Sequence, residues 1–388
     1  MNTTQEQLTD IHTMRCTSKR SYDVQIAHRV LDPDNDALAR RIGGRRALVV
    51  TTPSVARLHG EALQGYLARH APDTDVVTLE CSEDHKSLRL VARLCHEAQQ
   101  RGLDRKAVLV GLGGGVCTDV VSVAASAIRR GVACIRVPTT LIGQIDAGIG
   151  VKGAVNFAGK KSFFGCFYPP EAVLIDPAFL ATLPQAFLRY GLAEIVKMAL
   201  VRDRELFELV EAHHSALLRS NFAEPPHEGE RVIWLSAKRM LEELQTNPYE
   251  DQTYQRLVDL GHTFSPLLEA ACDFTMHHGQ AVAIDLALTV TLAEALGVLS
   301  GAERDRVVRL LRQSGLPTTS RLLTSELCRE ALREAARHRG SALNLVLPVA
   351  IGKASFLERV EDLPPEALDA AVARLAQEAA AEIAEGWS

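Results

Sequence analysis

A short stretch in the middle of the chain combines charged and amide side chains with glycines. It contains Asp146, Lys152, Asn156 and the pair Lys160-Lys161, and its flanks are strongly apolar. An unpaired buried polar group costs about 1–3 kcal/mol, so groups at this density are not ordinary core. A polar, anionic substrate would give them a purpose, and we interpret the stretch as a binding site.

A second group of residues has the composition of a metal site. Glu194 and Lys197 are three apart in a helical pattern and therefore share a face. His262 stands between a glycine and a threonine. His277 and His278 are adjacent and diverge around a helix, so we expect only one of them to bind. One carboxylate and two histidines, at three helix starts of one domain, predict a catalytic zinc site with open coordination positions. Each residue also has an ordinary role, as a surface ion pair or a capping histidine, so the spacing alone leaves both interpretations open.

A run of glycines predicts a site for phosphate groups. Gly111-Leu-Gly-Gly-Gly115 follows an apolar strand pattern, and residues 116–126 have a helical one. Consecutive glycines at such a junction let backbone N–H groups approach a pyrophosphate at the positive end of the helix. The run lacks the GxGxxG spacing, so a tight structural turn is the alternative. Asp119, in the first helical turn, is either a cap or a ligand-binding group.

Two charged segments are ambiguous when taken alone. Residues 83–86, Glu-Asp-His-Lys, follow a predicted strand and are typical of a solvated loop. The pair Arg129-Arg130 precedes a strand over residues 134–137 that ends in Pro-Thr-Thr. Arginines at a strand entrance are often surface charge only. They are also suited to phosphate, because guanidinium binds its oxygens in bidentate fashion.

The elements that must position these residues change character along the chain. Short apolar runs alternate with helical periodicity in the first part, which predicts a parallel, doubly wound sheet. Its strands are expected at 22–30, 46–50, 75–79, 107–111 and 134–137. Beyond about residue 186 helical runs dominate, with one short strand at 344–348. These runs are expected at 190–218, 229–246, 264–273, 279–297, 302–314, 325–337 and 365–384.

We therefore predict an α/β fold with two domains and a site in the cleft between them. The first is a doubly wound α/β domain over residues 1–185, with 1–24 loosely held, and the second is a mainly helical domain over 186–388. A chain of 388 residues exceeds one comfortable core, which agrees with this division.

Composition narrows the class of protein. Its 47% hydrophobic and 23% charged residues are ordinary for a globular enzyme, and a net charge of −5 argues against nucleic acid or an anionic membrane as partner. The eight cysteines are scattered without a CxxC pair, and the N-terminus lacks an apolar core typical of a signal peptide. We expect reduced thiols and a cytoplasmic location.

Taken in order, these motifs resemble those of the dehydroquinate synthase superfamily, the NAD-dependent sugar phosphate cyclases. The resemblance rests on GGGVxxD, VPTT, GLAExxK, GHTF and HHGxAVAID, together with LIDPAFLATLP and NLVLPVAIGK. It extends over roughly residues 45–355. It implies a homodimeric enzyme that uses NAD and a divalent metal ion on a small sugar phosphate.

The resemblance also implies roles for individual residues. The implied metal ligands, for Zn²⁺ with Co²⁺ as the alternative, are Glu194, His262 and His278. The implied NAD contacts are Glu83, Lys86, Gly114, Gly115, Asp119, Thr139 and Thr140. The implied catalytic residues are Asp146, Lys152, Asn156, Lys160 and Lys197. Further substrate contacts are Arg130, Lys161, Arg256, Asp259 and His338. Whether Arg130 acts within one chain or across a dimer stays open.

The sequence departs from dehydroquinate synthases at positions expected to contact the substrate. Those enzymes continue GHTxGHAxE, whereas this chain has Pro266 in place of the second histidine. Residues 159–161 read Gly-Lys-Lys rather than GKN, Arg256 is one residue out of register, and residues 337–340 read Arg-His-Arg-Gly rather than the usual Asp-Lys-Lys. These differences argue against a dehydroquinate synthase.

The altered positions resemble cyclases that act on sedoheptulose 7-phosphate. Residues 155–171, Asp259 and His338 are most similar to 2-epi-5-epi-valiolone synthases. The expected reaction is transient oxidation at C5 by NAD⁺, elimination of phosphate from C7, re-reduction, and an intramolecular aldol that joins C7 to C2. The alternatives are 2-epi-valiolone synthase, 3-dehydroquinate synthase, a metal-dependent polyol dehydrogenase, and a sugar phosphate sensor without activity.

Overall fold

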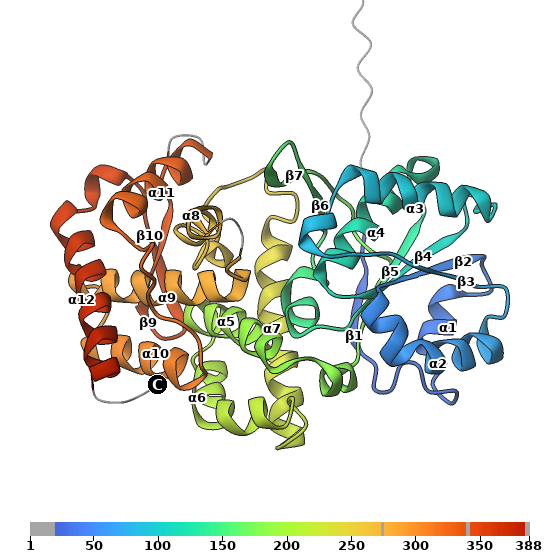
Figure 1. Ribbon diagram of the computed structural model, residues 1–388, viewed down its shortest axis with the longest axis horizontal. Helices are drawn as coiled ribbons and strands as arrows, with labels where there is room; N and C mark the ends of the chain where they lie inside the picture. The colour runs from blue at the N-terminus through green and yellow to red at the C-terminus, as the bar shows by residue number, and fades with distance from the viewer. Residues whose placement is uncertain (1–19, 273–274, 339–341, 385–388) are drawn as a thin grey trace, which may run out of the picture.

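The computed structural model describes residues 20–272, 275–338 and 342–384, without the side chains of His338, Glu382 and Ile383. Figure 1 shows a sheet-containing half built from the first part of the chain and a mainly helical half built from the rest. Helix α7 stands between them, and a β-hairpin lies at the top of the view where the two halves meet. No described helix has the length and apolar character needed to cross a membrane.

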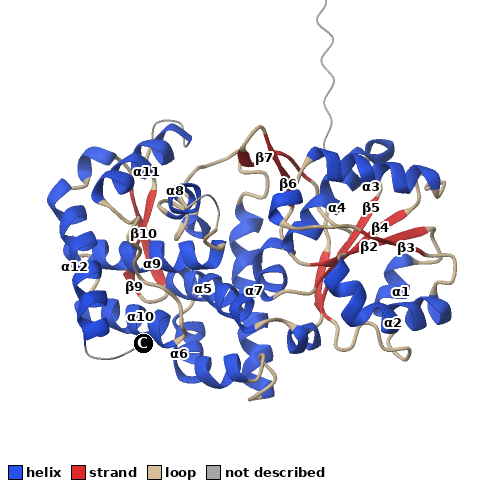
Figure 2. Ribbon diagram, in the orientation of Figure 1, coloured by secondary structure: helices blue, strands red, loops and turns tan. Residues whose placement is uncertain are grey.

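The first half is a six-stranded parallel sheet in the order β1-β8-β5-β4-β2-β3. Its strands are β1 (Asp23–Ile26), β2 (Ala47–Thr51), β3 (Asp75–Thr78), β4 (Val108–Gly113), β5 (Ala133–Pro138) and β8 (Ala172–Ile175). Its helices are α1 (Ala37–Ile42), α2 (Pro53–His70), α3 (Leu88–Gln100) and α4 (Gly115–Ala127). The predicted doubly wound sheet is confirmed, and Figure 2 shows its strands together on one side of the molecule.

The sheet is buried on both faces, which explains why its strands are continuous apolar runs. In β2, Leu48 and Val50 pack in the cluster that contains α3 and α4. Their neighbours Ala47 and Val49 pack on the opposite face, with α1 and α2. Strand side chains alternate between faces, so one five-residue strand contributes to two apolar layers.

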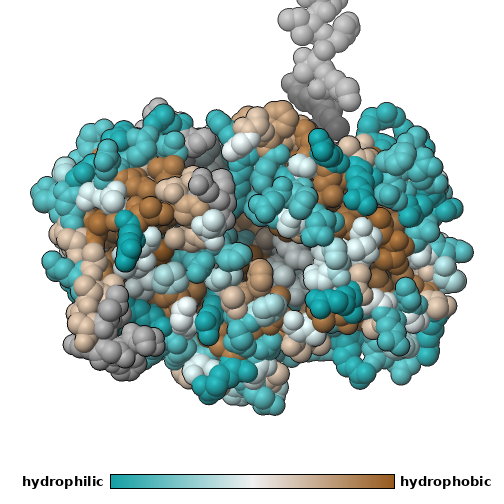
Figure 3. Space-filling view, in the orientation of Figure 1, coloured by the Kyte–Doolittle hydropathy of each residue, from teal (hydrophilic) through white to brown (hydrophobic). Residues whose placement is uncertain are grey.

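A two-stranded antiparallel hairpin was not predicted from the sequence. It consists of β6 (Lys152–Phe157) and β7 (Lys160–Phe167), and it packs on α4. Its polar residues hid the strand signal, because most of β7 is exposed. Figure 3 shows a mainly hydrophilic face with an apolar patch at the top, over this hairpin, where Phe157, Phe163 and Phe164 are exposed.

The second half contains eight α-helices among the described residues and one more hairpin. The helices are α5 (Gln185–Arg202), α6 (Arg204–Arg219), α7 (Pro226–Thr246), α8 (Ser265–Ala271), α9 (His278–Ala295), α10 (Gly301–Gln313), α11 (Ser325–His338) and α12 (Pro365–Ala384). The hairpin pairs β9 (Leu345–Ala350) with β10 (Lys353–Leu357). Short helical turns lie at 83–85, 128–130, 143–147, 177–182, 257–259 and 360–362.

The single helical run predicted over 190–218 is wrong. Asp203 has an extended backbone and its Oδ1 accepts a hydrogen bond from the Leu206 N–H at 3.0 Å, so it ends α5 and caps α6. The strand β10 was also missed. Aspartate is a common N-cap because its carboxylate satisfies a free N–H of the first turn, a role that helical periodicity does not show.

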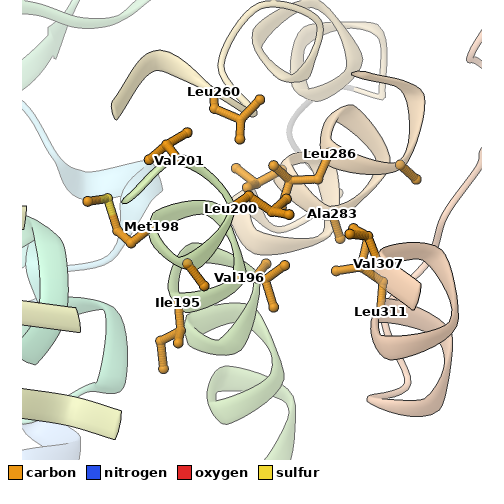
Figure 4. Close-up of a cluster of buried hydrophobic side chains, with 14 of the residues drawn as sticks. Ile195, Val196, Met198, Leu200, Val201, Leu260, Ala283, Leu286, Val307 and Leu311 are labelled. Atoms are coloured by element: carbon orange, nitrogen blue, oxygen red, sulfur yellow. The ribbon is translucent and has the colours of Figure 1, made fainter. Parts of the chain in front are cut away.

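Helices α5 and α9 form the centre of the second half. Side chains such as Leu200 and Leu286 from these helices pack together, with α10 alongside (Figure 4). Every residue of α9 from Gly279 to Ala293 is buried except Gln280. A helix that is buried on all sides belongs inside a domain, and this pair forms the base on which the site is built.

Candidate active site

Three side chains meet at the edge of the helical half as a potential metal site. One ligand atom from each of Glu194, His262 and His278 lies within 4.8 Å of the others. Glu194 Oε1 is 3.2 Å from His278 Nε2 and 3.8 Å from His262 Nε2. The structure therefore brings together the three residues that the sequence resemblance implied as ligands.

Close packing of α5 and α9 brings these residues together. A Cβ on Gly279 would lie 2.4 Å from Tyr190 Cα, so the glycine lets the start of α9 approach α5. Gly191 plays the same part toward Leu141. The prediction of three helix starts is wrong for Glu194, which lies in the middle of α5, whereas His278 does begin α9.

The second nitrogen of each histidine has a partner that fixes its orientation. His278 Nδ1 lies 2.8 Å from Glu269 Oε1, and His262 Nδ1 lies 3.0 Å from the Leu260 carbonyl oxygen. Donation from Nδ1 to an oxygen leaves Nε2 with a lone pair, the arrangement typical of histidines that bind metal. The donor set therefore fits Zn²⁺ or Co²⁺, with open positions for a substrate oxygen.

The charge states of the histidines agree with this interpretation. Burial and the nearby Lys197 ammonium lower the pKa of His262, which keeps it neutral. Burial also opposes the charged form of His278, but hydrogen bonds with Glu194 and Glu269 outweigh it and raise its pKa to about 9. In the metal-free protein His278 carries a proton at neutral pH, in the place a divalent cation would take.

A buried lysine lies beside the potential metal ligands. Lys197 Nζ is 2.6 Å from Glu194 Oε2 and 3.0 Å from Asp146 Oδ2, and the lysine is 2% exposed. Burial alone would lower the pKa of Lys197, but the two carboxylates raise it above its ordinary value. Burial likewise opposes ionisation of Glu194, but Lys197 and the histidines hold its pKa well below the usual range. The result is a fixed ammonium that reaches the site together with Asp146.

The loop that carries His262 is held by a buried carboxylate. Asp285 Oδ2 accepts hydrogen bonds from the backbone N–H groups of Thr263, Phe264 and Ser265 at 2.6–3.0 Å. Burial raises the pKa of Asp285 to about 6 although these N–H groups favour its charged form. Asp285 therefore fixes the turn directly after the histidine.

The residues implied to contact NAD gather at the carboxyl ends of the sheet. Gly114 and Gly115 follow β4, and Thr139 and Thr140 follow the neighbouring β5. A Cβ on Gly114 would lie 3.0 Å from Thr140 Cγ2, so there is little room for a side chain at this position and the backbone stays accessible. The first N–H groups of α4 point into this space, and in open α/β sheets ligands bind at this edge. The geometry fits a pyrophosphate.

Lys86 corrects our interpretation of residues 83–86 as a solvated loop. It is 6% exposed, and its Nζ lies 2.7 Å from Asp119 Oδ2 and 3.4 Å from Ser162 Oγ. Burial raises the pKa of Asp119, while Lys86 opposes the shift. Glu83 also has a partner on the hairpin, Asn156. This segment therefore connects the nucleotide edge to the hairpin.

Asn156 holds the hairpin in place and has little hydrogen-bonding capacity left. Its Nδ2 donates to the Glu83 carbonyl oxygen at 3.2 Å and to Glu83 Oε1 at 3.0 Å, and its Oδ1 accepts from the Ser162 N–H at 2.8 Å. The structure thus uses this amide to connect β6, β7 and residues 83–86. A direct catalytic contact would require these hydrogen bonds to be exchanged.

The predicted substrate lysines do not all converge in this conformation. Lys152 is paired with Glu250, which also binds Arg256 at 2.7 Å, and Lys161 Nζ lies 2.5 Å from Glu269 Oε2. Lys160 is exposed, with its Nζ 5.8 Å from the ring centre of Phe163. All three belong to the hairpin, whereas Lys197 lies in α5.

The remaining predicted substrate contacts lie farther apart. Arg256 Nη2 is 3.3 Å from Asp259 Oδ1. His338 ends α11, and its side chain lies outside the described residues. Arg130 is exposed before the amino end of β5, and this six-residue strand spans about 20 Å, so within one chain Arg130 is far from Thr139. The alternative that Arg130 acts within its own chain is not supported by this geometry.

Sequence reasoning missed Glu269, Glu250 and Asp285. Glu269 stands in GHTFSPLLE, and its alignment with the family's GHAxE was the available signal. Asp285 ends the HHGxAVAID motif, where it was quoted without a role. Glu250 lies in a charged loop after α7, and nothing in its local sequence marks it.

Two family models match the chain in tandem. The model for the N-terminal part of 3-dehydroquinate synthase matches residues 76–190, and the model for the C-terminal part matches residues 191–337. The chain belongs to the dehydroquinate synthase family. Within this family it is 45% identical to the 2-epi-5-epi-valiolone synthase of Streptomyces glaucescens over 360 residues, which are 92% of each protein.

Other family members support the same placement. The 2-epi-5-epi-valiolone synthase of Streptomyces hygroscopicus subsp. jinggangensis is 41% identical over 92% of this chain and 87% of its own length. The structure named ValA, a 2-epi-5-epi-valiolone synthase from that organism, has NAD⁺ and Zn²⁺ bound. It matches with a TM-score of 0.88 at 40% identity, over 95% of this chain and 100% of its own.

Proposed function

We propose that this member of the dehydroquinate synthase family is a phosphate-eliminating lyase that converts sedoheptulose 7-phosphate to 2-epi-5-epi-valiolone. The observation that carries the proposal is the Glu194, His262 and His278 cluster beside the buried Lys197–Asp146 pair. Support for the substrate comes from 37–45% identity to five proteins named 2-epi-5-epi-valiolone synthase.

We propose NAD and Zn²⁺, with Co²⁺ as the alternative ion, as the bound groups. When present, NAD takes a hydride from the substrate and returns it, and the divalent ion polarises the oxygen at the carbon that is oxidised. Glu194, His262 and His278 would hold the ion, and the glycines after β4 would face the pyrophosphate. Both sites fit the residues present.

The chain's own side chains would orient the sugar and receive the phosphate. Lys197 keeps its positive charge and donates a hydrogen bond to a substrate hydroxyl or carbonyl oxygen. Asp146, whose side chain is 28% exposed, accepts one from a neighbouring hydroxyl. Lys152, Lys160 and Lys161 lie on the hairpin, from which their ammonium groups can reach the phosphate oxygens as the site closes.

We further propose that the enzyme is a cytoplasmic homodimer in which Arg130 serves the site of the other chain. Its place at the amino end of β5 supports this arrangement over action in its own chain. The choice of substrate would rest on Asp259, Pro266 and His338, the positions at which the sequence departs from dehydroquinate synthases.

The decisive experiment incubates the enzyme with sedoheptulose 7-phosphate, NAD⁺ and Zn²⁺. We expect one phosphate for each cyclitol formed, the 2-epi-5-epi configuration by NMR, and no accumulation of NADH. A product with the 2-epi configuration would favour the alternative synthase. Dehydroquinate from the 3-deoxy-2-ulosonate 7-phosphate would indicate dehydroquinate synthase, and accumulating NADH would indicate a polyol dehydrogenase.

A further inference from the structure

Glu269 lies between two parts of the site and belongs to neither set of predicted ligands. It is 4% exposed and sits in α8, one turn after Pro266. Its two carboxylate oxygens have different partners. Oε1 lies 2.8 Å from His278 Nδ1, and Oε2 lies 2.5 Å from Lys161 Nζ. One buried side chain thus contacts a potential metal ligand and a lysine at the turn end of the hairpin.

The contact with His278 selects the form of the imidazole that can bind a cation. A carboxylate at Nδ1 retains the proton there, so Nε2, which faces Glu194, is the nitrogen that gives up its proton and coordinates the cation. Helix α8 is itself held firmly, because Asp285 binds the three N–H groups at its start. The helix that carries Glu269 is therefore held in a fixed position relative to α9.

The contact with Lys161 fastens the turn end of the hairpin to the helical half. On the sheet side the same end of the hairpin is held by two contacts with residues 83–86, the Asn156–Glu83 hydrogen bond and the Lys86–Ser162 hydrogen bond. At the other end of the hairpin, Lys152 pairs with Glu250 and Phe167 packs edge-on against Tyr249. The Lys161–Glu269 ion pair joins the turn end of the hairpin to the group around the histidines.

We propose that Glu269 is a positioning residue that couples metal binding at His278 to the placement of the lysine-bearing hairpin over the substrate. The proposal rests on the proposed function for the role of the site, but its metal-binding half can be measured without turnover. Because one carboxylate serves both partners, its loss affects both, whereas loss of Lys161 releases the hairpin and removes a proposed phosphate contact but leaves the Glu269–His278 contact intact.

The test uses three variants of the full-length enzyme and measures Zn²⁺ affinity by competition with a chromogenic chelator. Glu269→Ala removes both contacts, and we expect the Zn²⁺ dissociation constant to rise about 10–100-fold. Glu269→Gln can still accept from His278 Nδ1 but turns its amide toward Lys161, so we expect a smaller loss of affinity and a higher KM. Lys161→Met should raise KM and leave the dissociation constant within about threefold of wild type.

Controls separate positioning from a general loss of stability. Glu330 is an exposed carboxylate that pairs with Arg333 at 2.5 Å, and Glu330→Gln should change neither metal affinity nor KM. The visible spectrum of the Co²⁺-loaded protein should change in Glu269→Ala and stay the same in Lys161→Met. If Glu269→Ala does not fold, Glu269→Gln carries the metal measurement.

Two results would overturn the proposal. The first is a Zn²⁺ dissociation constant in folded Glu269→Ala, or in Glu269→Gln if the former does not fold, that equals the wild-type value. The second is additivity, in which Glu269→Gln raises KM as much in the Lys161→Met background as in wild type. Lys161→Met already removes the contact between the two residues, so Glu269→Gln should add little to KM in that background if the contact matters. A wild-type enzyme that binds Zn²⁺ but does not release phosphate from sedoheptulose 7-phosphate would refute the proposed function and leave the metal comparison valid.

Discussion

Replacing Gly279 with alanine tests whether the spacing of α5 and α9 sets the metal geometry. The new Cβ would lie 2.4 Å from Tyr190 Cα and Cβ and 2.6 Å from the Tyr190 carbonyl oxygen. Two of these atoms belong to the backbone, so a change of rotamer does not relieve the clash. Ordinary contact begins at 3.4 Å, and the two helices must therefore separate by about 1 Å at this point.

A shift of this size exceeds what a metal site tolerates. Ligand distances at Zn²⁺ vary by only about 0.2 Å, and His278 is the residue directly before Gly279. We expect Gly279→Ala to lose at least tenfold in Zn²⁺ affinity, with a comparable loss of phosphate release. Overpacking between buried helices should lower the free energy of unfolding by about 1–3 kcal/mol.

The assay compares urea unfolding of the metal-free proteins with Zn²⁺ titration against a chelator. Gly60→Ala is the matched control, because Gly60 lies within helix α2 and a Cβ there meets nothing within 4 Å. That variant should be as stable as wild type or more stable by up to about 1 kcal/mol, since alanine favours helix over glycine. Wild-type Zn²⁺ affinity in a folded Gly279→Ala protein would show that helix spacing does not determine the site.

Three other predictions concern pH, the hairpin and the dimer. The pKa of His278 is about 9 in the metal-free protein, so Zn²⁺ must displace its proton, and apparent affinity should rise roughly tenfold per pH unit between about pH 6.5 and 8.5 and level off above 9. By linkage, the charged imidazole also stabilises the metal-free fold below pH 6.5, and this contribution is lost as the pH rises through 9. A Zn²⁺ affinity that does not change with pH would contradict the assignment of His278 as a metal ligand. Lys152→Ala should abolish phosphate release with an unfolding free energy within about 1 kcal/mol of wild type, because its 51% exposed ion pair adds little stability. Wild-type turnover there would remove Lys152 from the mechanism. Coexpression of Arg130→Ala and Lys197→Met chains should restore about a quarter of wild-type activity if Arg130 acts across a two-fold dimer, and none if each chain uses its own arginine.

Much of the fold could be predicted from local pattern alone. Apolar runs such as residues 46–50 and 107–111 are strands of the sheet, because a parallel sheet buried on both faces requires continuous apolar residues. The hairpin at 152–167 escaped prediction because β7 is largely exposed and both strands begin with lysine. The break at Asp203 escaped because a capping residue fits a helical pattern until its backbone dihedral angles are known.

The sequence predicted which residue types form the candidate site, but it did not predict how they are arranged. Motif spacing with the family resemblance singled out Glu194, His262 and His278, which the structure brings within reach of one ion. Nothing in the sequence showed that the Asn156 amide would donate its hydrogen bonds to Glu83 rather than to a substrate. Burial of Lys86 likewise follows from a partner, Asp119, that lies elsewhere in the chain.

The sequence by itself determined the residue types, the family and the kind of chemistry. These are properties of short segments, because a glycine run, a GLAExxK helix or a GHT turn can be recognised from a few consecutive residues. Only the tertiary structure decided which groups meet. Glu269 joins His278 to Lys161, and Arg130 lies at the amino end of β5, because helix packing and strand direction set distances between segments that local pattern does not connect.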